Sequence, residues 1–170
     1  MIPHRVLASA VSFATQVALA LACGAQTMPG TAGETLSGKH IVLADATRGH
    51  PTVLVAGFSR EGGNGTGPWV QAVRADKALA GAAVYQVAML EGAPGFIRGT
   101  IKNGMRKGMS AADQDQFVVL VQDEKLWRQF FEVTTDKEPY AALIDAKGNV
   151  LWHGHGAAER MEPELKAAMR

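Results

Sequence analysis

The sequence has only one cysteine, Cys23, in 170 residues. An internal disulfide, or thiol–disulfide exchange by a cysteine pair, is therefore excluded. The formal net charge is only +1, so no overall field favours nucleic acid or an acidic membrane surface. The Gly-x-Ser-x-Gly pattern of serine hydrolases is also missing. The composition, with 47% hydrophobic and 19% charged residues, is that of an ordinary globular protein. The chain is long enough for one domain with a hydrophobic core.

Residues 1–25 have the layout of a secretory signal peptide. Arg5 provides a short positive region, residues 6–22 are mostly apolar or small, and the A-x-A rule permits cleavage near the end. The stretch is too short and too rich in small residues for a membrane span. Cys23 stands where a lipoprotein cysteine would, so lipidation is an alternative. We expect an exported protein of the periplasm or envelope, free or lipid-anchored; the rival interpretation is a buried first helix.

The rest of the chain alternates strand and helix patterns. Residues 26–38, rich in Gly, Thr and Ser, predict an extended leader before a domain spanning 39–170. Periodicity predicts strands at 39–43, 52–58, 82–90, 116–121, 140–145 and 150–153, and helices at 69–79, 96–107, 123–131 and 158–169. Asp123 is the expected N-cap of the third helix. The order predicts an α/β fold, with a mixed central sheet, helices on both faces, and a C-terminal β-hairpin plus helix.

A glycine-rich stretch, Ser59–Gly67, follows the second expected strand and precedes Pro68. A P-loop would end in Gly-Lys-Ser/Thr, and this stretch ends Gly-Thr-Gly-Pro, so nucleotide binding is disfavoured. Two interpretations remain open. The stretch is either a flexible loop that relieves a tight strand-to-helix turn or a loop that binds a partner.

Two smaller groups of side chains are candidates for binding. His153 and His155 share one face if their strand continues, and are weak candidates for metal ligands, because no third ligand is evident nearby. Arg98, Lys102 and Arg106 share one face of the expected 96–107 helix. That basic face is either simply solvated or a docking surface for an acidic or membrane-adjacent partner.

The stretch Pro139–Gly156 is typical of the end of a thioredoxin-like domain. A proline precedes a strand, a tight turn around Gly148 and a second strand follow, and a last helix closes the chain. The Glu138–Pro139 bond is a candidate cis peptide, because cis bonds are nearly confined to proline. In this fold the pre-strand proline faces the loop after the first central strand, which here is the glycine-rich stretch.

Several short pieces together resemble the mitochondrial ATP synthase assembly-factor family, which is thioredoxin-like and has bacterial relatives. The pieces are Gly57–Glu61, Trp69, Leu90-Glu91, Ile97-Arg98, Met105-Arg106, Tyr140–Asp145 and Trp152–Ala157. The resemblance implies a redox-inactive assembly factor or chaperone, with a protein partner that could be an integral membrane subunit and with no cofactor. The alternative is an enzyme that binds a small molecule or anion on the same scaffold without thiol chemistry. The residues expected to bind the partner are Ser59, Arg60, Glu61, Trp69, Arg98, Lys102, Arg106 and Pro139.

Overall fold

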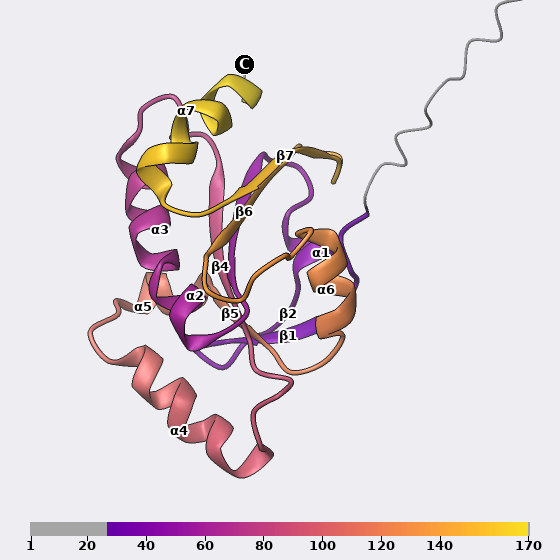
Figure 1. Ribbon diagram of the computed structural model, residues 1–170, viewed down its shortest axis with the longest axis vertical. Helices are drawn as coiled ribbons and strands as arrows, with labels where there is room; N and C mark the ends of the chain where they lie inside the picture. Colours follow the sequence, from indigo (N-terminus) through magenta and orange to yellow (C-terminus); the bar gives the residue numbers. More distant parts are fainter. Residues whose placement is uncertain (1–26, 170) are drawn as a thin grey trace, which may run out of the picture.

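The computed structural model describes residues 27–169, so the expected signal peptide and Cys23 lie outside the described residues. Seven strands form one mixed sheet (Figure 1), in the order β2-β1-β5-β4-β3-β6-β7. The strands are β1 (Ala32–Thr35), β2 (His40–Val42), β3 (Thr52–Gly57), β4 (Ala83–Met89), β5 (Phe117–Leu120), β6 (Tyr140–Ile144) and β7 (Val150–His155). Helices cover both faces: α1 (Leu43–Ala46), α2 (Arg60–Asn64), α3 (Thr66–Ala75), α4 (Gly95–Arg106), α5 (Ala111–Asp115), α6 (Glu124–Phe130) and α7 (Ala158–Ala168).

The strand β3, every residue of which is buried, lies in the interior of the sheet between β4 and β6. It runs parallel to β4 and antiparallel to β6. Its β-branched residues, such as Val53 and Val55, suit a strand covered on both faces, because an apolar run without alternation can bury both sets of side chains. The central strand predicted from residues 52–58 therefore lies where the sequence pattern indicates.

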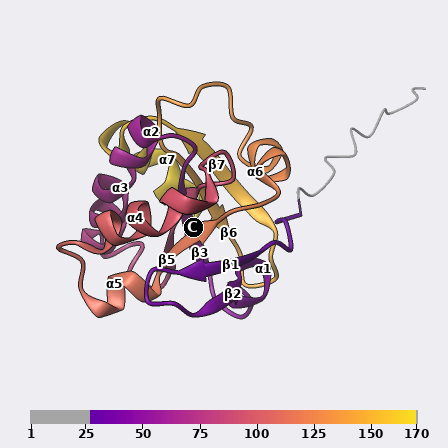
Figure 2. The ribbon, with the colours of Figure 1, turned by 90° about the horizontal axis from the view of Figure 1, so that it is seen from below.

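Two main apolar clusters pack on the two faces of the sheet. On one face Leu54 and Trp127 belong to the cluster beneath α1 and α6. On the other face Val53 and Trp69 belong to the cluster beneath α3 and α7. A smaller third cluster contains Phe117, and partly buried Met105 of α4 packs against it. Figure 2 shows α3 and α4 on the same flank of the molecule, and Figure 1 shows α4 below α3.

The segment expected as an extended leader contributes a strand to the sheet. β1 lies between β2 and β5 and pairs with both in antiparallel fashion. Leu36 is fully buried, and Thr31 and Thr35 are also buried. The folded unit therefore begins before Lys39, the expected start of the domain. The physical reason is pairing: β1 fills the open edge of β5, which a short polar strand can do without an apolar run of its own.

The glycine-rich stretch after β3 is helical, and the expectation of a loop there was wrong. Its residues form α2 and the first turn of α3, with Gly65 between the two helices. Glycine has low helix propensity, so the sequence argued against a helix here. Close packing against the 136–139 segment overrides that propensity, as described below.

The C-terminal hairpin forms as the sequence predicts, with β6 and β7 antiparallel. Asp145 accepts hydrogen bonds from the backbone amides of Lys147 and Asn149, which closes the turn. The Glu138–Pro139 bond is trans, contrary to the cis candidate, because the described residues contain no cis peptide. Asp123 does occupy the N-cap position of α6, but its side chain does not cap the helix and instead accepts from the Thr31 hydroxyl.

Candidate functional site: a groove between α3 and α4

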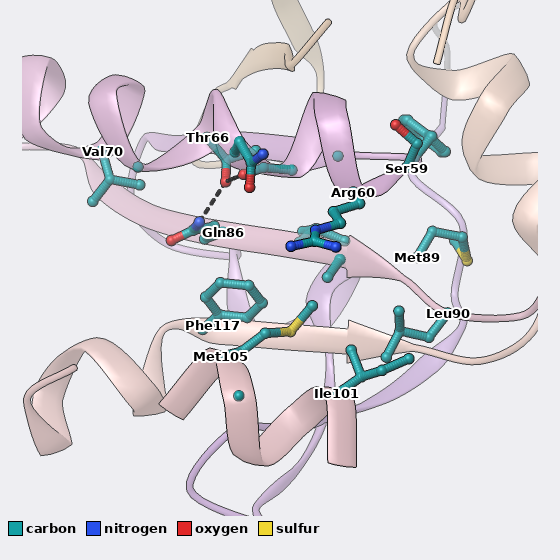
Figure 3. A pocket seen from close by; sticks show the side chains of 18 of the residues that line it. Ser59, Arg60, Thr66, Val70, Gln86, Met89, Leu90, Ile101, Met105 and Phe117 are labelled. Carbon is teal, nitrogen blue, oxygen red and sulfur yellow. Dashed lines mark hydrogen bonds between the residues drawn. The ribbon is translucent and has the colours of Figure 1, made fainter. Parts of the chain in front are cut away.

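A groove of about 1240 Å³ opens between helices α2 and α3 on one side and α4 on the other. Figure 3 shows its floor, where Gln86 of β4 and Phe117 of β5 lie beneath the two walls. Val70 faces the groove from the α3 side, and Ile101 and Met105 face it from α4. The floor is largely apolar, with one polar link where the Gln86 side-chain amide donates to the Thr66 hydroxyl. The groove can therefore hold a mainly apolar ligand, with a few polar groups to orient it.

The position of α2 is fixed by contacts that only glycine allows. The Ser59 hydroxyl accepts from the Gly62 amide at 3.1 Å and donates to the Asp136 carbonyl at 2.6 Å. A Cβ on Gly62 would meet the Asp136 and Glu138 carbonyl oxygens at 2.7 Å. A Cβ on Gly65 would meet the Pro139 ring at the same distance. The glycines thus let the helix press against the segment before β6, and this contact sets where the groove begins.

The α4 wall carries two stripes, and the apolar one faces the groove. Ile101 and Met105 line the cavity, whereas the neighbouring basic side chains form hydrogen bonds to other parts of the chain. Lys102 pairs with Glu34 of β1 at 2.8 Å, and this contact lowers the pKa of the Glu34 carboxyl. Arg106 donates to the Leu36 carbonyl. Arg98 completes the basic stripe by donating to the carbonyls of Ala93 and Glu91.

The basic stripe therefore anchors α4 to β1, to Leu36 just after β1, and to the loop that precedes α4. These contacts engage the guanidinium and ammonium groups that a docking surface would need. The partner-binding role expected for Arg98, Lys102 and Arg106 stays a prediction, but the structure gives these residues an internal role as well.

Arg60 is the charged side chain of the groove that has no protein partner in the described part of the chain. The other charged residues that line it form ion pairs with one another: Arg74 with Asp113, and Arg128 with both Glu124 and Asp136. Arg60 is exposed and extends from α2 into the cavity (Figure 3). An arginine in this state can receive a carboxylate or phosphate from a ligand.

Arg128 ties α6 to the segment before β6 at the end of the groove near Ser59. Its guanidinium contacts Asp136 at 2.6 Å and Glu124 at 2.7 Å, and lies over the Phe58 ring at 5.3 Å. These carboxylates raise the pKa of Arg128, with Asp136 making the largest contribution. In turn the hydrogen bond from Arg128 lowers the pKa of the Asp136 carboxyl.

The Arg128–Asp136 pair predicts a loss of stability in acid. A folded-state pKa below the unfolded value stabilises the fold above the unfolded pKa, near 3.9 for aspartate, and this stabilisation disappears as the pH falls through the folded pKa. We expect the urea midpoint of Asp136→Asn to lie below that of the wild type at neutral pH. The two midpoints should converge as the pH falls from about 7 to about 3. The matched control is Glu159→Gln, which removes an exposed carboxylate that forms no ion pair within the described residues. Equal curves for the two variants would contradict the prediction.

The remaining residues expected at the site lie apart from the groove. Glu61 is exposed on α2 but does not line the cavity. Trp69 is fully buried, and its indole N–H donates to the Gly156 carbonyl at 2.8 Å. Pro139 is buried against Gly65. Of the eight residues expected to bind a partner, Ser59 and Arg60 are those that line the groove.

The apolar lining was missed by the sequence analysis. Ile101 and Met105, which line the groove, are four positions apart, which places them on one helical face. That spacing is the signal that could have identified the inner face of α4. The basic residues run beside it at the same spacing, and the functional interpretation of the sequence rested on them.

The two candidate metal ligands each lie beside a glutamate. His155 Nδ1 is 2.5 Å from Glu138, and His153 Nε2 is 3.6 Å from Glu132. Within residues 27–169 no group of three or more His, Cys, Asp or Glu side chains is arranged to hold a metal ion. Over the same range, no helix has the length and apolar character needed to cross a membrane.

No protein-family model and no curated protein sequence matches this chain. Solved structures do match. Etrx1, the pneumococcal exposed lipoprotein thioredoxin from Streptococcus pneumoniae, has a TM-score of 0.52 at 20% identity, over 80% of this chain and 97% of its own. A thiol:disulfide interchange protein of the thioredoxin family from Chlorobium tepidum gives 0.52 at 20%, over 85% and 97%. BsSco, from the Sco family of cytochrome c oxidase assembly proteins, gives 0.56 at 14%, over 85% and 94%.

At identities of 20% or less, these likenesses establish the fold. The thioredoxin-like prediction is confirmed, with a mixed sheet of seven strands, helices on both faces and a terminal hairpin plus helix. The single cysteine of this chain leaves no cysteine pair on that scaffold.

Proposed function

We propose that this chain is an exported thioredoxin-like domain that works without thiol chemistry, as an assembly factor or chaperone for an envelope protein complex. The observation that carries the proposal is the groove beside α2. Thiol chemistry on this fold needs a cysteine pair at the helix after the first central strand. Here that helix carries Arg60 and borders an apolar cavity of about 1240 Å³.

Three further observations support the proposal. The sequence pieces that resemble the ATP synthase assembly-factor family span most of the domain. BsSco shows that a protein of this fold can belong to a family of assembly proteins. The apolar, partly open cavity suits a protein segment better than it suits turnover, because it holds no positioned acid–base pair free of other partners.

The groove can be tested by two matched substitutions in α4. Gly104 lines the cavity and Gly99 does not, and an added Cβ at either position meets no atom within 4 Å. Leucine at either site also raises helix propensity by about 1 kcal/mol, so both variants should fold. We expect Gly104→Leu to abolish capture of a membrane protein from detergent-solubilised cells, and Gly99→Leu to retain it.

The captured protein is identified by mass spectrometry and rebound in purified form to both variants. Equal recovery with Gly104→Leu and Gly99→Leu would remove the groove from the proposed function. Recovery of no specific protein with the wild type would overturn the assembly role itself.

The alternative, an enzyme or binder for a small anionic molecule, is favoured by one observation, the unpaired Arg60 in the groove. A ligand that binds only the folded state raises the melting temperature, and the rise grows with the logarithm of the ligand concentration above its dissociation constant. Thermal stabilisation by a small anion, lost in Arg60→Ala and unaccompanied by any captured protein, would favour this alternative.

A further inference from the structure

One charged side chain of the groove, Arg60, forms no ion pair within the described residues. Three arginines and three carboxylates line it, and all but Arg60 are engaged in ion pairs within the described residues. Arg60 also lacks the backbone carbonyl contacts that hold Arg98 and Arg106. A guanidinium can form charge-assisted hydrogen bonds to a carboxylate, and these are stronger than neutral ones.

The floor and the α4 wall are rich in methionine. Met89, Met105 and Met109 all line the cavity. Methionine side chains are unbranched and polarizable, so a surface built from them adapts to apolar side chains of different shapes. Surfaces of this kind bind amphipathic helices, which lay an apolar face into a groove.

The size of the groove agrees with a helical occupant. The cavity of about 1240 Å³ exceeds the usual range for small ligands of about 300–1000 Å³, which leaves room for a segment of protein chain about 10 Å across. A single fatty-acid chain would leave much of this space unfilled.

From the charge, the lining and the size together, we infer that the groove binds an amphipathic helix of a client protein, with an acidic side chain of that helix paired to Arg60. The apolar face of the client helix lies against Ile101, Met105 and Phe117. The carboxylate points toward α2. This inference rests on the proposed function, because it names the chemistry of the client segment.

The experiment uses three synthetic helical peptides of about 18 residues, a length at which helices become stable in isolation. They share one leucine face and differ at a single position at its edge, which is Glu, Gln or Lys. Binding of each fluorescently labelled peptide to the full chain is measured by anisotropy. We expect the Glu peptide to bind about tenfold or more tightly than the Gln peptide, because a charge-assisted pair replaces a neutral one.

A charge exchange makes the test specific for Arg60. In Arg60→Glu the order should reverse, with the Lys peptide binding most tightly. The matched control is Arg160→Ala, which removes another exposed arginine, on α7, and should leave the wild-type order intact. Circular dichroism of each variant verifies that it is folded.

The results that would overturn this inference differ from those that would overturn the proposed function. Equal binding of the Glu and Gln peptides, or an unchanged order in Arg60→Glu, overturns the role of Arg60 even if Gly104→Leu abolishes capture of a client. Absence of peptide binding, or tighter binding of myristate than of the Glu peptide, overturns the helical occupant. None of these results contradicts the proposed function, which is tested separately by whether capture of a membrane protein is lost in Gly104→Leu.

Discussion

Replacing Trp69 with alanine should lower the free energy of unfolding by about 3–5 kcal/mol, the usual cost of deleting a buried aromatic side chain. Trp69 is fully buried, packs 6.2 Å from the Trp152 ring, and donates its indole N–H to the Gly156 carbonyl. It thereby joins α3 to the turn between β7 and α7. Because small domains are stable by only about 5–15 kcal/mol, this one change should remove a large part of the stability.

A second variant separates packing from hydrogen bonding. Trp69→Phe keeps an aromatic ring but leaves the Gly156 carbonyl without its donor, which should cost about 1–3 kcal/mol. Chemical denaturation of both variants is followed by far-ultraviolet circular dichroism, because the substitutions alter tryptophan fluorescence. A loss below about 1 kcal/mol in Trp69→Ala would contradict the core assignment. Trp69 would then remain a candidate for the partner-binding role that the sequence predicts.

Gly62→Ala should destabilise the protein although it places a better helix former in α2. The new Cβ would lie 2.7 Å from two backbone carbonyl oxygens, those of Asp136 and Glu138, which cannot rotate away. Overpacking of this kind costs about 1–3 kcal/mol, and the gain in helix propensity offsets at most about 1 kcal/mol of it. We expect a net loss of about 1–2 kcal/mol in the free energy of unfolding.

Gly63→Ala is the matched control one residue along the same helix. A Cβ at Gly63 meets no atom within 4 Å, so propensity acts alone and should stabilise the protein by about 0.5–1 kcal/mol. Opposite signs for the two variants would support the packing of α2 against the 136–139 segment. Stabilisation by both would show that α2 does not press on that segment. The Glu peptide should also bind Gly62→Ala more weakly, because moving α2 moves Arg60.

The sheet could be predicted from the sequence because its strands are encoded locally. Thr52–Gly57 and Phe117–Leu120 are short apolar runs bounded by turn residues, which is the pattern of strands buried on both faces. The β6–β7 hairpin is encoded in the same way by the turn around Gly148. The burial of Trp69 and Trp127 agrees with the general tendency of tryptophans to lie in the core, although Trp69 was expected to bind a partner.

The rest depends on contacts that are distant in sequence. β1 has no apolar run, and it is a strand because Glu34 and Thr35 pair with β5. α2 is helical because Gly62 can approach the 136–139 segment, although its glycines predict a loop. In α4 the sequence contains two stripes at one spacing, and only the position of the sheet decides that Ile101 and Met105 face the groove. The most informative part of the site was thus the least predictable.

The place of β1 in the sheet also affects the order in which parts of the fold can form. The Thr31 hydroxyl donates to Asp123 and accepts from the Trp127 indole, 96 positions further along the chain. Contacts between such distant residues form slowly, because the entropy of closing the intervening loop must be overcome first. A chain that emerges from a ribosome or a translocation pore with its N-terminus first cannot pack β1 against β5 and α6 until both have followed. β1 can pair early with β2, which follows it closely in the sequence, but its contacts with β5 and α6 form only after most of the domain has been made.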